Sequence, residues 1–320
     1  MLDLLNQIFV IFANPDFYAA AIRLTTPILL AAMGSIFCER AGIMNIASEG
    51  WMLIGAMTAV TATYYLGNPW LGLLVAGLVA LLAASIFAFF VVRVGTDHIV
   101  TGVALNLFSL GLTSLIFRRL FGPMSKALDI TGLPTWHIPV LGDIPILGRI
   151  FFNQSPLVYL AFLCVPFVHF IMFNTRWGLN VRAAGESPRA VDSVGENLFG
   201  IRIGTILIAG LMAGLAGAFL SIGQTTIFQE GMTAGRGYIM YTAIVFGKWL
   251  PKGVLVGALI FGAADALQLR IQAIGSILPY QFALMIPYLF TIAAIVITVG
   301  KVAWPAAYGQ SYRREDRGVE

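Results

Sequence analysis

The residues of this chain that could do chemistry stand between long apolar stretches. Glu39 and Glu49 bracket the stretch ERAGIMNIASEG, which also holds Asn45. A charged group in hydrocarbon costs about 2.5–3.5 kcal/mol on insertion scales, so these side chains belong at an interface or in a polar cavity. Two interpretations stay open. Asn45 and Glu49 line a cavity for a polar solute, or the stretch is a hairpin loop with Glu49 beside the positive end of the next helix.

Two later apolar segments carry polar residues spaced so that they share one helix face. These residues are Asn106, Ser109 and Thr113 on one segment, and Asp265, Gln268 and Gln272 on the other. Such a face lines a path for a polar solute or hydrogen-bonds to other helices, at about 0.6 kcal/mol per bond. Helix-to-helix bonding is the favoured interpretation for the first face. Asp265 differs, because a lone acid in an apolar helix indicates a functional role.

The polar segment 176–202 predicts a short amphipathic helix outside the membrane. Ser187 is placed to cap it, Pro188 suits its first position, and Gly195 ends it. A small, surface-charged helix of this kind suits a cleft on a partner protein. A solvated connection lying on lipid headgroups is the alternative.

Motifs for covalent chemistry are missing from the sequence. It has no Gly-x-x-x-x-Gly-Lys-Ser/Thr loop, no Gly-x-Ser-x-Gly elbow and no His-Glu-x-x-His. Cys38 and Cys164 are single cysteines in apolar surroundings, which excludes a Cys-x-x-Cys metal site. We expect a non-catalytic chain without a metal or cofactor of its own.

The composition identifies lipid as the main solvent of this chain. Of its 320 residues 59% are hydrophobic and only 11% are charged, against about 25% charged in soluble proteins. An all-α protein follows, because helices satisfy their own backbone hydrogen bonds in a bilayer. We expect nine transmembrane helices, at about residues 17–36, 50–66, 70–92, 98–120, 155–174, 203–223, 237–249, 253–270 and 280–300.

Basic residues suggest how these helices are oriented. Segment 176–202 carries four arginines, so the rule that basic short loops stay in the cytoplasm places it inside. Alternation then places the N-terminus outside and the tail inside. Segment 121–154 is too rich in proline to span, and becomes the largest external loop, a possible docking surface for a partner.

A weak internal repeat supports this layout. EGWMLIGAMTA begins at Glu49, and RGYIMYTAIVFG begins at Arg236, each after a long helix and before a loop with proline and glycine. Because the two copies start on opposite sides, the repeats are inverted, an arrangement that transporters use to place a substrate path between two halves. Chance similarity between apolar sequences is the alternative.

Five stretches in order resemble one known family. They are ERAGIMNIASEGWMLIGA, TDHIVTGVALNLFSLGLTS, AAGESPRAVDSVGENLFGIRI, GMTAGRGYIMYTAIVFGKW and GALIFGAADALQLRIQ. Together they resemble the permease subunit of bacterial ABC importers for sugars and nucleosides. The similarity covers most of the chain. It is strongest to the shorter of two paired permeases in nucleoside importers that use a basic-membrane-protein-type lipoprotein.

This resemblance implies a single transmembrane permease domain over residues 1–320, with the fold of a type II ABC importer, in the bacterial inner membrane. It implies a tandem ABC ATPase that holds ATP and Mg²⁺, a second and longer permease, an external substrate-binding lipoprotein, and no nucleic acid. The ATPase-coupling residues carried over are Gly185, Glu186, Ser187, Pro188, Arg189, Ala190, Asp192 and Gly195. The candidate path residues remain Asn45, Glu49, Asn106, Ser109, Asp265 and Gln268.

The substrate and the energy source have open alternatives. Nucleosides are favoured over ribose because sugar permeases differ in the segment that matches Asn45–Gly50. Riboflavin importers and branched-chain amino-acid permeases share related membrane domains. A secondary transporter driven by an ion gradient is the rival from another class, supported by the inverted repeat and Asp265.

Overall fold

The computed structural model describes residues 11–122, 130–274, 280–298 and 304–312. Within these ranges the chain is almost entirely helical. Its helices are α2 (Pro15–Arg40), α3 (Ser48–Leu66), α4 (Pro69–Ala88), η1 (Phe89–Val94), α5 (His98–Phe121), η2 (Gly148–Phe152), α6 (Pro156–Asn174), α7 (Arg176–Glu186), α8 (Pro188–Ser193), α9 (Leu198–Ala218), η3 (Phe219–Thr225), α10 (Arg236–Phe246), α11 (Pro251–Ile274) and α12 (Tyr280–Thr298).

Each of the nine apolar segments expected from the sequence contains one of these helices. By length and composition, six helical stretches among the described residues can cross a membrane: Pro15–Arg40, Pro69–Val94, His98–Phe121, Pro156–Asn174, Leu198–Thr225 and Pro251–Ala273. Helices α3, α10 and α12 account for the other three segments. The count of nine spanning helices therefore stays a prediction.

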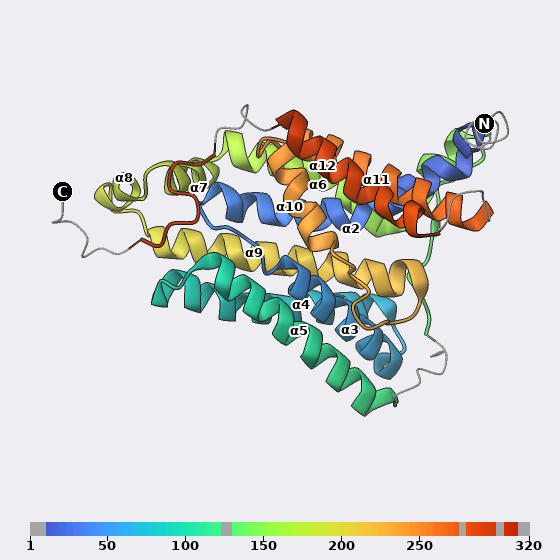
Figure 1. Ribbon diagram of the computed structural model, residues 1–320, viewed down its shortest axis with the longest axis horizontal. Coiled ribbons are helices and arrows are strands. Elements are labelled where there is room, and N and C mark those ends of the chain that lie inside the picture. Colours follow the sequence, from blue (N-terminus) through green and yellow to red (C-terminus); the bar gives the residue numbers. More distant parts are fainter. Residues whose placement is uncertain (1–10, 123–129, 275–279, 299–303, 313–320) are drawn as a thin grey trace.

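Helices α2 and α9 form the centre of the molecule and run antiparallel (Figure 1). Gly34 of α2 lies against Met212 of α9, while Arg23 of α2 lies near Gln224, just beyond the other end of α9. Helices α3 and α4 pack on α9, and α10 and α11 pack on α2. Each half of the chain thus packs its later helices on the first helix of the other half, which agrees with an inverted repeat.

Small residues allow α9 to approach its neighbours closely. A Cβ on Gly210 or Gly214 would collide with the side chains of Ala84 or Ala80 on α4. A Cβ on Gly217 would collide with the backbone carbonyl of Met52 on α3. The glycines in GLMAGLAGAFLS therefore serve helix packing, as such spacing predicts for membrane proteins.

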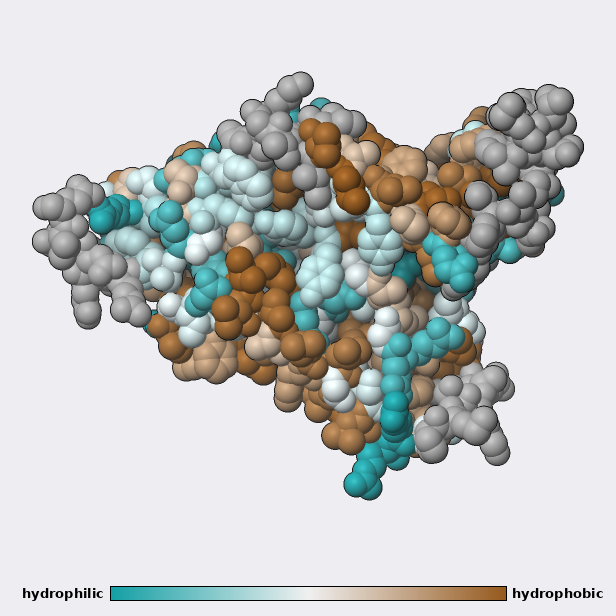
Figure 2. Space-filling model, viewed as in Figure 1, coloured by the Kyte–Doolittle hydropathy of each residue, from teal (hydrophilic) through white to brown (hydrophobic). Residues whose placement is uncertain are grey.

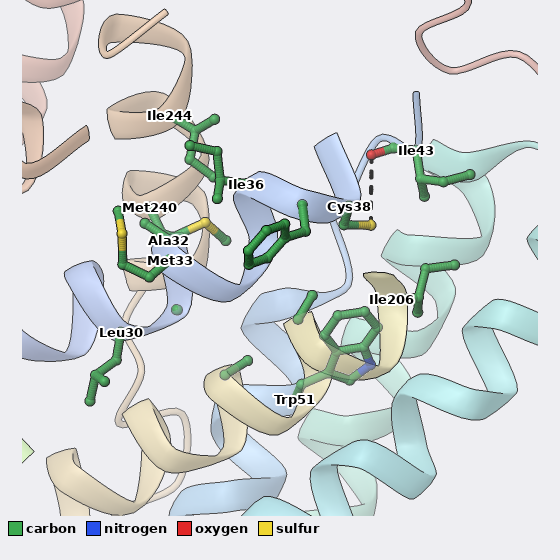
Figure 3. Close-up of a cluster of buried hydrophobic side chains, with 14 of the residues drawn as sticks. Leu30, Ala32, Met33, Ile36, Cys38, Ile43, Trp51, Ile206, Met240 and Ile244 are labelled. Atoms are coloured by element: carbon green, nitrogen blue, oxygen red, sulfur yellow. Dashed lines mark hydrogen bonds between the residues drawn. The ribbon is translucent and has the colours of Figure 1, made fainter. Parts of the chain in front are cut away.

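The core between the two halves is apolar. Met33 and Ile36 of α2 lie beside Met240 and Ile244 of α10 (Figure 3), and all four side chains are buried. Trp51 of α3 is also buried and stacks edge-to-face on Phe87 of α4, with ring centroids 5.7 Å apart. This packing joins α3 to α4 and α10 to α2.

Pro27 interrupts the hydrogen bonding of α2. Proline has no N–H, so the carbonyl of Arg23, four residues earlier, loses its usual helical donor. The side chain of Gln224, from the π-helical turn η3, donates to this carbonyl at 3.0 Å. A residue of the second half of the chain thus supplies the hydrogen bond that Pro27 removes from the first half.

The loops that the sequence analysis assigned to one side of the membrane lie at one end of the molecule. At the end with α7 and α8, Arg40 donates to the carbonyls of Trp249 and Lys248, at 3.3 and 3.4 Å. Arg93 lies 5.8 Å above the ring of Phe199 at the same end. Figure 2 shows hydrophilic residues gathered at this end and hydrophobic ones along the lower helices. The orientation across the membrane stays a prediction.

The described part of segment 121–154 contains a small hairpin. Strand β1 (Trp136–His137) pairs antiparallel with β2 (Asn153–Gln154), and η2 lies between them in the chain. The N–H of Leu133 donates to the carbonyl of Ile222 at 2.9 Å, which attaches the segment to η3. Its external position stays a prediction.

Candidate functional site

Glu49 joins the starting points of two helices inside the molecule. It lies in the first turn of α3. Its carboxylate accepts hydrogen bonds from the backbone N–H groups of Gly235, at 2.8 Å, and Gly237, at 2.7 Å, at the start of α10. Both helix N-termini carry partial positive charge, so one carboxylate stabilises both. The hairpin interpretation was right about the helix end but missed the second helix.

The backbone before α10 is shaped for this close approach. Gly231 and Gly235 have φ of 69° and 82°, and Ala234 has φ of 47°, all in the left-handed region that favours glycine. A Cβ on Gly237 would meet the backbone N of Glu49 at 2.6 Å. Only a glycine fits there, so the start of α10 can lie directly against the start of α3.

Asn45 organises the extended loop between α2 and α3. Its N–H donates to Glu39 Oε1 at 2.9 Å, and its side-chain Nδ2 donates to the hydroxyls of Ser35 and Ser48, at 2.9 and 2.7 Å. Glu39 is fully buried. The Oδ1 atom of Asn45 is buried and has no partner among the described residues. A buried carbonyl oxygen without a donor is costly.

Asn106 of α5 connects this loop to both interior helix starts. Its Oδ1 accepts from the N–H of Gly50 at 2.8 Å. Its Nδ2 donates to the carbonyl of Ile46 at 2.9 Å and to the hydroxyl of Tyr238 at 3.0 Å. Asn106 therefore binds other segments, as the helix-to-helix interpretation predicts.

Ser109 and Thr113 behave differently from that interpretation. Both are buried on the same face as Asn106. Their hydroxyls donate to carbonyls of their own helix, Leu105 for Ser109 and Ser109 for Thr113, each at 2.7 Å. Bonds to the carbonyl four residues earlier satisfy a hydroxyl locally. The prediction that these two residues join helices is therefore wrong.

Asp265 is not a lone acid. Arg236, the first residue of α10, approaches it with Nη2 3.5 Å from Oδ2, and both side chains are mostly buried. The sequence interpretation missed this pair because the residues belong to different helices. Gln268 lies half-buried one turn further along α11, and the Nε2 of Gln272 is buried without a partner among the described residues.

The start of α10 is thus the centre of the candidate path residues. Glu49 caps it, Asn106 bonds Tyr238 near its beginning, and Asp265 pairs with Arg236. Asn45 belongs to the adjoining loop. The sequence signal that could have located this centre is the glycine-rich GMTAGRGY before an apolar helix too short to span.

The predicted coupling residues lie at one end of the molecule, where α8 confirms the helix expected between Pro188 and Gly195, and α7 precedes it as a helix the sequence interpretation missed. Gly185 and Glu186 end α7, and Pro188 begins α8. Ser187 stands between them and makes no side-chain capping bond, so its predicted capping role is wrong. Gly195 follows α8 with φ of 81°. The break arises because proline disfavours helical backbone at the residue before it.

The surface of α8 is exposed, as docking requires. Arg189 and Ala190 are exposed, Asp192 is half-buried, and Val194 is 75% exposed directly after the helix. Among the described residues, no group of three or more His, Cys, Asp or Glu side chains could hold a metal ion. The role of α8 as a docking surface stays a prediction.

The family of the chain follows from comparison with known proteins. A family model for the permease component of branched-chain amino acid transport systems matches residues 17–297. The chain belongs to this permease family. No solved structure matches it. The permease is a multi-pass membrane protein, in agreement with the six helical stretches in the described ranges that are long and apolar enough to cross a membrane.

Three relatives resemble this permease over nearly their whole length. The guanosine ABC transporter permease protein NupQ of Bacillus subtilis is 36% identical, over 93% of this chain and 96% of its own. The nucleoside ABC transporter permease protein NupC of Lactococcus lactis is 33% identical, over 97% and 99%. TsgC13 of Haloferax volcanii, provisionally named a glucose ABC transporter permease, is 36% identical, over 92% and 97%.

Proposed function

We propose that this permease forms half of the membrane path of an ATP-driven nucleoside importer. Two of the three relatives above are named for nucleoside or guanosine transport. Its own residues bind and guide the solute and perform no covalent chemistry. ATP and Mg²⁺ belong to a separate ATPase, and a second, related permease completes the path.

The observation that carries this proposal is the interrupted helix α10. A helix that begins inside the membrane leaves its first N–H groups without helical partners. Transporters use such interior helix ends to bind polar or charged groups of a substrate. Here Glu49 occupies that position, bonded to Gly235 and Gly237. Movement of Glu49 would release two backbone donors toward the path.

Two polar groups at this place suit a nucleoside. Asn45 Oδ1 is a buried acceptor without a partner among the described residues, and Tyr238, bonded to Asn106, is 46% exposed. An acceptor can bind ribose hydroxyls or base amino groups, and an exposed tyrosine ring can stack on a base. We propose these residues as path-lining groups.

The α8 end supports the assignment of energy source. An exposed helix with sharp limits suits a cleft on an ATPase subunit. Exposed apolar residues along α4, including Leu74, Leu78 and Leu82, provide the surface that faces lipid or the second permease. The external lipoprotein would deliver solute at the opposite end, near segment 121–154.

Uptake by cells with and without the gene tests the proposal. The panel contains labelled guanosine, uridine, glucose, ribose, riboflavin and leucine, each measured before and after ATP depletion with the ion gradients clamped. We expect gene-dependent uptake of nucleosides that disappears with ATP. If glucose were the only compound whose uptake depends on the gene, the substrate would be a sugar and not a nucleoside.

The same experiment addresses the rival mechanism. A secondary transporter would keep its uptake after ATP depletion and lose it when the ion gradient collapses. The pairing of Asp265 with Arg236 weakens that rival, because it neutralises the acid that suggested ion coupling. Uptake that follows the ion gradient would overturn our proposal.

A further inference from the structure

The C-terminal segment Trp304–Tyr312 lies across the end of the molecule that carries α7 and α8. Figure 1 shows it as the red loop beside α7, next to the start of α9. Its ring of Trp304 stacks edge-to-face on Trp249, with centroids 4.8 Å apart. Trp249 is fully buried, so the segment begins against the packed interior.

Backbone bonds fix the middle of the segment to two other elements. The N–H of Ala307 donates to the carbonyl of Gly185 at 2.8 Å, at the end of α7. The N–H of Gly309 donates to the carbonyl of Gly42 at 2.9 Å, in the loop after α2. The segment therefore holds the end of α7 and the loop before α3 together.

Two tyrosines extend these attachments in opposite directions. The hydroxyl of Tyr312 donates to Asp192 Oδ2 of α8 at 3.1 Å. The hydroxyl of Tyr308 donates to the carboxylate of Glu39 and lies 3.2 Å from the hydroxyl of Tyr241 of α10. Burial and the nearby Glu39 carboxylate raise the pKa of Tyr308, so this hydroxyl keeps its proton and remains a donor.

Glu39 leads directly to the candidate path. Its other oxygen accepts from the N–H of Asn45, whose side chain bonds Ser48 at the start of α3. Glu49 follows Ser48 in the same turn. Hydrogen bonds, joined by the covalent backbone between Tyr308 and Tyr312 and between Ser48 and Glu49, thus connect Asp192 on α8 with the start of α3.

We propose that Tyr308 and Tyr312 are positioning residues that transmit displacement of α8 to Asn45 and Glu49 during transport. The proposal rests on the proposed function, since it requires an ATPase that moves α8. The two tyrosines would not touch solute. Their hydroxyls determine how strongly movement of α8 is coupled to movement of the path residues.

The test uses the full transporter, reconstituted in liposomes with its ATPase, second permease and binding lipoprotein. Tyr308→Phe and Tyr312→Phe remove single hydroxyl groups and keep the rings. We expect each to lower the number of nucleosides moved per ATP hydrolysed by roughly three- to tenfold. The double variant should have the same ratio of nucleosides moved to ATP hydrolysed as the more impaired single variant, because both hydroxyls act in one series. Tyr65→Phe, on an exposed ring beside Phe121 at the opposite end, is the matched control.

The ratio separates this role from a merely structural one. A structural defect lowers the amount of assembled transporter, and so lowers transport and hydrolysis together without changing their ratio. An unchanged ratio in both single variants would overturn the positioning role. If Tyr308→Phe fails to assemble, Tyr312→Phe alone decides, since its hydroxyl lies at the surface of α8. A wild-type transporter that moves no nucleoside would instead contradict the proposed function.

Discussion

At the scale of single residues, Glu49 is the side chain on which the interior site most depends. It satisfies two backbone N–H groups at the start of α10 with one carboxylate. Hydrogen bonds to a charged acceptor are stronger than neutral ones, at about 1.5–3 kcal/mol each. Replacement of Glu49 therefore affects both the stability of the protein and the shape of the path.

We expect Glu49→Gln to lower the free energy of unfolding by about 1–3 kcal/mol, because a neutral amide offers one acceptor oxygen for two donors. Glu49→Ala should cost more, since both N–H groups lose their partner. Thermal denaturation in detergent measures the effect, with Glu196→Gln on the exposed surface as control. Equal midpoints for Glu49→Gln and the wild type would show that Glu49 does not cap α10.

Arg118 and Glu230 form the corresponding contact at the opposite end. Arg118 Nε and Nη2 donate to the two carboxylate oxygens of Glu230 at 2.6 and 2.7 Å. The hydrogen bond from Arg118 lowers the pKa of Glu230. A lowered pKa means that the contact stabilises the fold above the ordinary titration range of glutamate and is lost as the pH falls through the lowered value.

We expect the wild type to exceed Glu230→Gln slightly in melting temperature at neutral pH, because both partners are exposed and solvent weakens the pair. The difference should stay constant above the ordinary glutamate range and vanish on further acidification. Arg118→Gln should behave in the same way. A difference that grew on acidification would contradict this assignment of the pair.

At the scale of elements, α9 shows how composition controls helix separation. Its glycines bring the backbones of α3 and α4 close enough for dispersion contacts that larger residues would prevent. Pro27 has a different effect on α2. It leaves the carbonyl of Arg23 without its helical donor, and the side chain of Gln224 supplies the missing hydrogen bond. Both features are local in sequence but have their effect between helices.

We expect Gly217→Ala to destabilise the protein by about 1–3 kcal/mol, because the new methyl group would collide with the Met52 carbonyl. Gly204→Ala, earlier in the same helix, meets no atom within 4 Å. It should be neutral or stabilising by about 0.5–1 kcal/mol. Thermal denaturation of the two variants gives the comparison. Equal stabilisation by both substitutions would mean that helix entropy, and not close packing, controls these glycines.

At the scale of the whole molecule, the polar residues divide into an interior site and an end surface. The interior site gathers at the start of α10, and the end surface is α8 with the adjoining residues. The segment 304–312 makes hydrogen bonds to both α8 and the loop after α2. We propose that docking of a partner at α8 acts on the path through this segment.

We expect Val194→Asp to weaken co-purification of the ATPase at least roughly tenfold, or about 1.4 kcal/mol, because a charge would replace an exposed apolar side chain at the docking surface. Membrane insertion should be unchanged. Val140→Asp, on an equally exposed valine of segment 130–154, is the matched control. Equal recovery of the ATPase with both variants would place the docking surface elsewhere.

The sequence by itself determined the helical segments, the family and the grouping of loops at two ends. These properties depend on local composition, because a chain in lipid must satisfy its backbone hydrogen bonds within each helix. It also gave Asn45, Glu49 and Asn106 as candidates, since buried polar groups in an apolar chain are conspicuous.

Only the tertiary structure decided which partners these residues have. Glu49 binds residues of α10, Asp265 pairs with Arg236, and Tyr308 reaches Glu39 from the far end of the chain. Ser187, which has the residue type and position of a helix cap, does not form one. Such contacts depend on how whole helices pack and where each one is interrupted. No local pattern of residues specifies that arrangement, because it arises from the combined packing of both halves.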